Sequence, residues 1–122
     1  MKIKVSVSME KDLRYLNKTG KSVINGFVKE LREKLGDKIV SIRLFGSKVR
    51  GDFHVESDTD IFILIKEKTP DIREKVSGLA ADYIFDYDIP LSIALYDLFE
   101  YKKNKELGSF FFESVEKEGV LL

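Results

Sequence analysis

Two aspartates, Asp58 and Asp60, stand one residue apart where an apolar run begins, within the segment LFGSKVRGDFHVESDTDIFILI, residues 44–65. Side chains two residues apart on a strand point to the same face, with Cα atoms about 6 to 7 Å apart. Carboxylates this close repel each other, and a divalent cation that prefers oxygen ligands removes the repulsion. Magnesium is the natural candidate, because one or two carboxylates and substrate phosphates usually hold it. The spacing therefore predicts that both aspartates are metal ligands.

The turn GSKVRG, residues 46–51, precedes the aspartates and carries groups that suit a phosphate. Gly46 lets the backbone approach an anion closely, and Ser47 adds a hydroxyl donor. Lys48 and Arg50 bring cationic donors, although each taken alone is more often a surface charge. If the residues after Ser47 begin a helix, its first N–H groups also point at the phosphate. The turn and the acids together suit a triphosphate.

The combination of GS with DTD on the next strand resembles the signature of the polymerase-beta-like nucleotidyltransferases, most closely the minimal nucleotidyltransferase group. The resemblance covers residues 36–65 and extends to the closing FFFESVEKEGVLL, residues 110–122. It implies transfer of a nucleoside monophosphate from ATP or another nucleoside triphosphate to a hydroxyl, with pyrophosphate leaving. It also implies the fold of that superfamily, a small mixed sheet covered by helices.

The same resemblance assigns roles to individual residues. Asp58 and Asp60 are the catalytic residues and ligate magnesium. Gly46 and Ser47 hold the phosphates, and Arg50 helps to neutralise the leaving group. These roles agree with the chemistry, because positioning, metal charge and fixed donors supply most of the acceleration in phosphoryl transfer.

A third carboxylate, which active members of the group generally carry on the neighbouring strand as metal ligand and base, is in doubt here. That strand is IPLSIALYD, residues 89–97, and its apolar pattern puts Ser92 at the expected position. Asp88 has the same parity but lies about 13 Å away along an extended strand. Asp97 has the opposite parity and begins a helix. Asp86 and Asp88 remain candidates only if the strand starts later or shifts register.

Two functional interpretations therefore stay open, an enzyme and a binding module. In the first, the two aspartates bind magnesium and nucleotide, and a third acid comes from Asp88 or from a partner subunit. In the second, the chemistry has lapsed and the chain is an antitoxin or regulatory binding module. The plainest alternative for Asp58 and Asp60 is a pair of solvated loop acids with Ser57 as a cap. His54 is best read as a solvated loop residue.

The elements that position these residues follow from apolar periodicity and from turn residues. In chain order we expect a helix over 22–36 capped by Ser22 and Gly36, a strand over 38–46, and a buried central strand over 60–65. A helix over 69–87 opened by Thr69 and Pro70 follows, then a strand over 89–97, and one or two short helices in the tail. Pro90 near the start of the last strand indicates an edge strand or an entry position. Residues 3–9 form a short strand or a frayed leader. This order predicts an α/β or α+β fold.

Composition limits the remaining classes of protein. The 122 residues fit a single domain spanning 1–122. Cysteines are absent, no apolar run is long enough to cross a bilayer, and the first residues lack the features of a signal peptide. We therefore expect a soluble cytoplasmic protein. Lys and Arg balance Asp and Glu at 21 each, which disfavours nucleic acid as a partner.

A separate protein is the expected acceptor, because the domain leaves little room for a region that selects one. The resemblance implies a HEPN-domain ribonuclease toxin, held in check by binding and by nucleotidylation of a tyrosine. The aromatic run at residues 110–112 steps round a helix, so the three rings cannot all face one core. At least one ring therefore lies near the surface, as a docking face or beneath the apolar tail 120–122.

Overall fold

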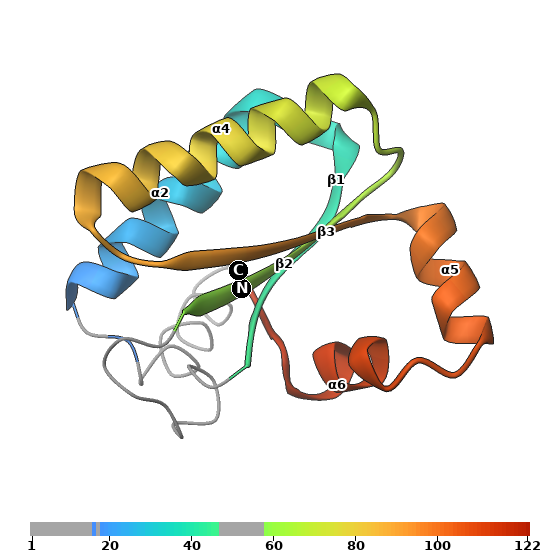
Figure 1. Cartoon of the computed structure of the whole chain (residues 1–122). Helices are drawn as coiled ribbons and strands as arrows, with labels where there is room; N and C mark the ends of the chain where they lie inside the picture. Colours follow the sequence, from blue (N-terminus) through green and yellow to red (C-terminus); the bar gives the residue numbers. More distant parts are fainter. Residues whose placement is uncertain (1–15, 17, 47–57) are drawn as a thin grey trace, which may run out of the picture.

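The computed structural model describes residue 16 and residues 18–46 and 58–122. Within these residues a mixed sheet of four strands has the order β3-β2-β1-β4, with helices on both faces (Figure 1). The strands are β1 (Ile39–Phe45), β2 (Thr59–Ile65), β3 (Leu91–Asp97) and β4 (Val120–Leu121). The helices are α2 (Lys18–Leu35), α4 (Pro70–Tyr87), α5 (Leu98–Glu106) and α6 (Phe110–Glu118), with a 3-10 turn over Gly36–Lys38. No helix in the described part of the chain is long and apolar enough to span a bilayer. The segment 3–9 lies outside the described residues.

Strand β2 lies in the middle of the sheet, as its continuous apolar run predicts. It pairs antiparallel with β1 and parallel with β3, and helix α4 makes the crossover between the two parallel strands. β3 lies at one edge of the described sheet, which confirms the edge predicted from Pro90. The tail adds β4 beside β1, where the Leu122 N–H donates to the Ile42 carbonyl oxygen at 2.9 Å.

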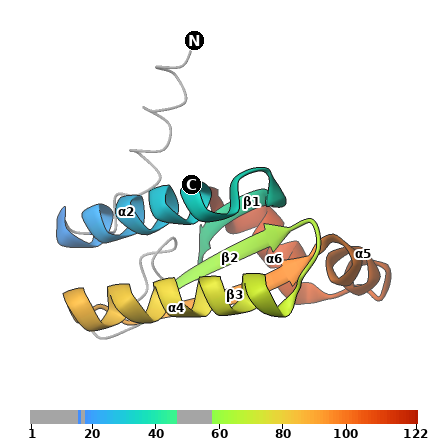
Figure 2. The ribbon, with the colours of Figure 1, turned by 90° about the horizontal axis from the view of Figure 1, so that it is seen from above.

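Alternating side chains of β2 face two different helical layers. Ile61 and Ile63 pack in a core cluster with α2 and α4, which lie along one face of the sheet (Figure 2). Phe62 and Leu64 pack in a second cluster with Phe112 of α6 on the opposite face. Each residue of β2 is therefore assigned to a face by its parity.

Helix α4 begins as predicted, and helix α2 does not. The Thr69 Oγ1 accepts the Ile72 N–H at 3.2 Å, and Pro70 is the first residue of α4. Helix α2 begins at Lys18, so Ser22 lies inside the helix and is not its N-cap. The predicted end is confirmed, because Gly36 follows Leu35 with a φ of 54°.

Tyr83 links the two helices of the first layer. Its hydroxyl donates a hydrogen bond to Glu30 of α2, and its ring meets Phe27 edge-on at a centroid distance of 5.8 Å. Burial and the bond to the Glu30 carboxylate raise the pKa of Tyr83 to about 12. Tyr83 therefore keeps its proton, and the link between the helices, throughout the neutral range.

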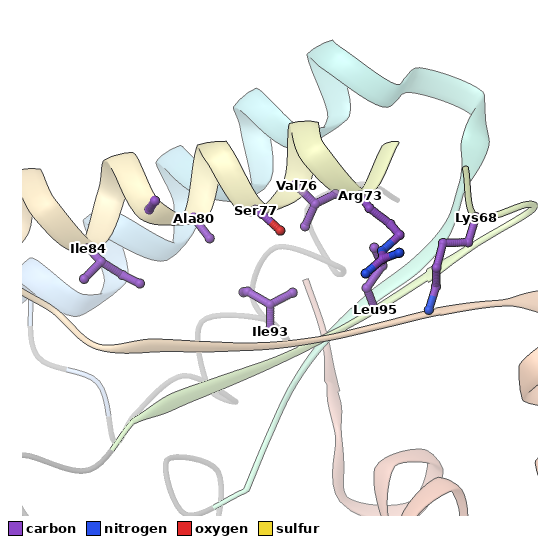
Figure 3. A pocket seen from close by; sticks show the side chains of 9 residues that line it. Lys68, Arg73, Val76, Ser77, Ala80, Ile84, Ile93 and Leu95 are labelled. Carbon is purple, nitrogen blue, oxygen red and sulfur yellow. The ribbon is translucent and has the colours of Figure 1, made fainter. Parts of the chain in front are cut away.

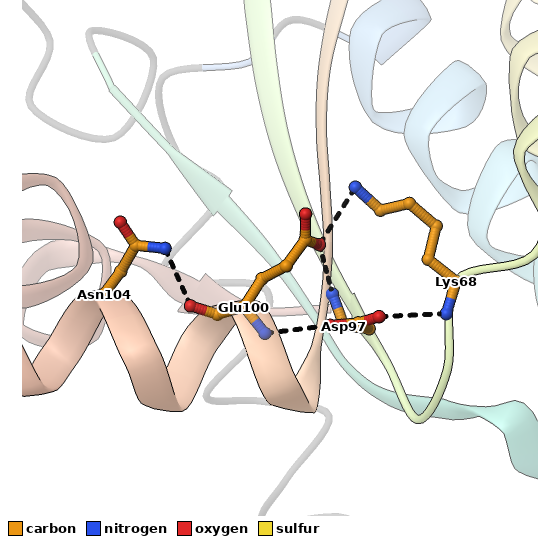
Figure 4. A network of polar contacts seen from close by, with 4 residues as sticks. All are labelled: Lys68, Asp97, Glu100 and Asn104. Carbon is orange, nitrogen blue, oxygen red and sulfur yellow. Dashed lines mark hydrogen bonds and ion pairs between the residues drawn. The ribbon is translucent and has the colours of Figure 1, made fainter.

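A polar network fixes the start of α5 to the loop that follows β2 (Figure 4). Asp97 is the N-cap: its Oδ1 accepts the Glu100 N–H at 2.9 Å, and the Glu100 Oε1 accepts the Asp97 N–H at 3.0 Å. Lys68 joins both residues, since its N–H donates to Asp97 at 3.2 Å and its Nζ lies 3.0 Å from the Glu100 Oε1. The prediction that Asp97 begins a helix is confirmed.

Replacing the cap by alanine, Asp97→Ala, is expected to lower the free energy of unfolding by about 1 to 2 kcal/mol at neutral pH. The Glu100 N–H, the strongest influence, holds the pKa of Asp97 below its usual value. The stabilisation is therefore present above the unfolded-state pKa of about 3.9 and is lost as the pH falls through the lower folded-state pKa. Urea unfolding at neutral and strongly acidic pH checks this. Asp97→Asn, which keeps a capping oxygen, should lose less, and an equal loss in both variants at every pH would contradict the account.

Candidate functional site

Asp60 lies near the start of β2 with a neighbouring strand on each side. Its Cα partners are Phe45, the last residue of β1, and Ser92 on β3. Asp60 is half-buried, and its even parity puts it on the sheet face of Phe62 and Leu64. The carboxylate therefore stands at the edge of the face that α5 and α6 cover further along the strands.

Gly46 brings the end of β1 against this carboxylate. Its φ is 83°, a conformation that side-chain-bearing residues rarely adopt. A Cβ atom placed on Gly46 would lie 2.3 Å from the Asp60 Oδ2. Only glycine allows this close approach. The turn after β1 and the Asp60 carboxylate are therefore in direct contact.

Asp58 stands just outside the strand, one residue before β2 begins. It is exposed, whereas Thr59 between the two aspartates is buried and its N–H donates to the Pro90 carbonyl oxygen at 2.9 Å. The prediction had both aspartates on the strand, and only Asp60 lies within it. Successive side chains of an extended segment point to opposite sides. Since Thr59 points into the protein, Asp58 and Asp60 point to the opposite side from Thr59.

The remaining predicted residues of the site lie in the segment 47–57, outside the described residues. They are Ser47, Lys48, Arg50, His54 and Ser57. The structure thus brings together Gly46 and Asp60, with Asp58 beside them.

Ser92, and no carboxylate, faces Asp60 across the parallel pair. The register is the one that the apolar pattern of residues 89–97 predicts. Asp88 caps the end of α4 with a φ of 54° and donates its N–H to the Ile84 carbonyl oxygen, so it lies before β3. No three acidic, histidine or cysteine side chains in the described ranges lie close enough together to hold a metal ion. A third carboxylate from Asp88 is therefore not in place in this conformation.

A magnesium ion fits the donors that are present. Asp58 and Asp60 offer hard carboxylate oxygens, and one or two carboxylates are enough when substrate phosphates supply further ligands. Asp58 is open to solvent, and the Gly46 backbone lies directly against the Asp60 carboxylate. The donor set is thus suited to a cation that arrives together with a polyphosphate.

A cavity of about 450 Å³ elsewhere in the molecule does not involve these residues. It lies between α4 and β3, where Ile93 and Leu95 face Val76 and Ala80 (Figure 3). Ile93 and Leu95 pack with the cluster of α2 and α4, so the cavity opens on the layer opposite Asp60. Cavity size alone does not identify the site.

The sequence pattern did not reveal an aromatic cluster beside the aspartate. Phe45, the strand partner of Asp60, meets Phe111 of α6 edge-on at a centroid distance of 5.5 Å. The three phenylalanines of α6 differ in exposure, at 85% for Phe110, 38% for Phe111 and 2% for Phe112. The prediction that at least one ring lies near the surface is confirmed. Val120 and Leu122 of the tail do not cover these rings, because they pack with the α2 and α4 cluster on the opposite face of the sheet.

Comparison with known proteins gives consistent matches. A family model described as a nucleotidyltransferase domain matches residues 24–120. A relative from Methanocaldococcus jannaschii, named "Putative protein adenylyltransferase MJ0141", is 37% identical over 100 residues, which cover 80% of this chain and 93% of the relative. A mutant MntA-HpeT toxin-antitoxin crystal structure is 25% identical with a TM-score of 0.50, covering 80% of this chain and 70% of that one. A toxin-antitoxin crystal structure with AMP-PNP has the same identity and TM-score and covers 79% and 69%.

Proposed function

The chain belongs to the nucleotidyltransferase domain family, and from this we propose that it transfers a nucleoside monophosphate from ATP to a hydroxyl group of a partner protein. The observation that carries the proposal is the contact between the Gly46 corner and the Asp60 carboxylate. A phosphate-binding turn and a metal-binding acid must lie together for nucleotidyl transfer, and a purely structural acid has no need of a bare backbone beside it.

Asp58 and Asp60 would hold magnesium in this proposal, and Gly46 with Ser47 would hold the phosphates. A bound magnesium ion supplies charge neutralisation on the phosphates and orients the group that is transferred. Arg50 would add a fixed cationic donor for the leaving group. The work of the chain is positioning, because phosphoryl transfer requires little covalent chemistry from the protein.

The proposed step forms a bond between the acceptor oxygen and the α-phosphorus of ATP. The bond from the α-phosphorus to the bridging oxygen of the β-phosphate breaks, pyrophosphate leaves, and the hydroxyl proton passes to water. Ser92 cannot take this proton as a carboxylate would. A tyrosine suits such a site, because its hydroxyl has a pKa of about 10 and loses its proton more easily than serine or threonine.

We place the acceptor tyrosine on a separate toxin protein of the HEPN class in the cytoplasm. The toxin-antitoxin pairs among the similar structures and the adenylyltransferase name of the relative support this choice. The chain would then act as an antitoxin that inactivates its partner by adenylylation.

The direct test is to express the chain with the product of the adjacent gene and to supply ATP labelled at the α-phosphate with magnesium. The expected result is a stable complex and label on a tyrosine of the partner, located by mass spectrometry. A chain that purifies alone and labels no protein would overturn the proposal.

A second candidate, a binding module without catalysis, is favoured by the serine opposite Asp60. Calorimetric titration with magnesium and ATP separates the two candidates. Binding that Asp58→Ala abolishes supports the enzyme. A wild-type chain that binds its partner but no nucleotide supports the module.

Introducing a carboxylate opposite Asp60, Ser92→Asp, is expected to strengthen the metal site. Without magnesium the new like-charge neighbour should lower the free energy of unfolding by about 0.2 to 1 kcal/mol. With magnesium the variant should gain more stability than the wild type, because binding to the folded state alone stabilises it. Thermal unfolding across a magnesium titration measures both effects.

Ser92→Asn is the matched control for this variant, because asparagine has the size of aspartate without its charge. It should show neither the magnesium-free loss nor the added magnesium response. Equal magnesium responses in the wild type and Ser92→Asp would mean that position 92 does not face the metal site.

A further inference from the structure

Rings from five elements gather on the sheet face that carries Asp60. We call them the aromatic cluster: Phe45 on β1, Phe62 on β2, Tyr96 on β3, Tyr101 on α5, and Phe111 and Phe112 on α6. Phe112 and Phe62 are buried at its base. Helix α6 lies across this face, on the side of the sheet away from α2 and α4 (Figure 1).

Two rings of the cluster are neighbours of Asp60 on its own face, beside Ser92 on β3. Phe45 is its partner across the β1-β2 pair, and Phe62 is two residues along β2. Residues directly opposite in an antiparallel pair have Cβ atoms about 4.5 to 5.5 Å apart. The aromatic cluster therefore adjoins the candidate phosphate and metal site at Asp60.

Phe111 contacts several other rings of the cluster and is also partly exposed to solvent. Its centroid lies 5.5 Å from Phe45, 6.1 Å from Phe62 and 6.2 Å from Tyr96. It is nevertheless 38% exposed, while the next residue, Phe112, is 2% exposed. Rings from three strands thus contact Phe111, and part of its own ring faces solvent on the face of the sheet that carries Asp60.

We infer that Phe111 is the stacking surface for the base of the bound nucleotide, an inference that rests on the proposed function. A nucleotide whose phosphates lie at Gly46 and Asp60 carries its base at the other end of the molecule. Phe111 is the most exposed ring of the aromatic cluster, and aromatic rings bind bases by stacking with little dependence on base identity. A ring fixed in advance also costs little ordering on binding.

The neighbouring residue Phe110 offers a matched control. It is on the same helix and is 85% exposed, and it makes no ring contact with any other described residue. Its removal takes away the same number of atoms without touching the cluster. The pair Phe111→Ala and Phe110→Ala therefore separates stacking beside Asp60 from a general loss of apolar surface on α6.

The test compares two probes, ATP and inorganic tripolyphosphate, each titrated calorimetrically with magnesium present. Phe111→Ala is expected to raise the Kd for ATP by about tenfold or more, which is within the range of base stacking on an aromatic ring. The Kd for tripolyphosphate, which has no base, should change less than about twofold. Phe110→Ala should bind both probes as the wild type does, and Phe111→Tyr should restore ATP binding.

The possible results separate the stacking role of Phe111 from the proposed nucleotidyltransferase function. Unchanged ATP affinity in Phe111→Ala, with the wild type binding both probes, overturns the stacking role alone. An equal loss of ATP and tripolyphosphate binding in Phe111→Ala also overturns it, because the ring would then act through the fold. A wild-type chain that binds neither probe overturns the proposed function together with the inference.

Discussion

Asp60→Asn is expected to lower the rate of nucleotidyl transfer by about 10³-fold, which corresponds to about 4 kcal/mol of lost transition-state stabilisation. Asparagine keeps the shape of aspartate and one oxygen, but it removes the negative charge that would hold the metal. Asp58 alone, exposed just before β2 begins, offers a weaker site. The measurement is the transfer of label from α-labelled ATP to the partner, at saturating magnesium.

The effect should fall on chemistry and metal dependence and leave the fold in place. Thermal unfolding of Asp60→Asn checks that the sheet remains formed, and a magnesium titration should show a weaker response than in the wild type. Asp71→Asn is the control, because Asp71 is an exposed acid in the first turn of α4 that pairs with Lys75 at 3.2 Å. A transfer rate within about twofold of the wild type in Asp60→Asn would remove that residue from the catalytic role.

Elements with strong local signals could be predicted from the sequence. Thr69 and Pro70 mark the start of α4 because a cap and a first-turn proline act within a few residues. The continuous apolar run of β2 indicates burial on both faces, and alternation in β3 puts Ser92 opposite Asp60. In these cases the physical cause is contained in the segment itself.

The start of α2 could not be predicted, because its first turn carries no apolar stripe. The helix begins with KTGK, and the buried positions that reveal its period begin at Val23. Ser22 is a good capping residue, but a capping side chain only acts as one if the helix starts there. Leu16, just ahead of the helix, is buried in the core cluster, a long-range contact that the local sequence does not indicate.

The aromatic cluster could not be predicted, because it depends on contacts between distant segments. Phe45 and Phe111 are far apart in the sequence. The residues around them do not indicate that α6 packs over β1 and β2. The run FFF indicates only that the rings point in different directions round a helix. Which ring packs against Phe45, the strand partner of Asp60, is decided by the packing of α6 on the sheet.

Gly46→Ala is expected to cost both stability and activity, for two separable reasons. The φ of 83° strains any residue with a Cβ atom by about 1 to 2 kcal/mol. The new Cβ would also lie 2.3 Å from the Asp60 Oδ2, so the carboxylate or the turn must move. Misplacing a reacting group by about 1 Å lowers rates by about 10²-fold, and we expect a loss of at least that size in nucleotidyl transfer.

Gly36→Ala isolates the backbone strain from the displacement of Asp60. Gly36 also has a positive φ, 54°, but a Cβ there meets no atom within 4 Å. It should therefore lower the free energy of unfolding by a similar amount and leave the transfer rate unchanged, as measured by urea unfolding and by the labelling assay. If both glycine variants lose activity equally, the loss comes from general destabilisation. If only Gly46→Ala loses activity, the reaction requires the undisplaced position of the Asp60 carboxylate.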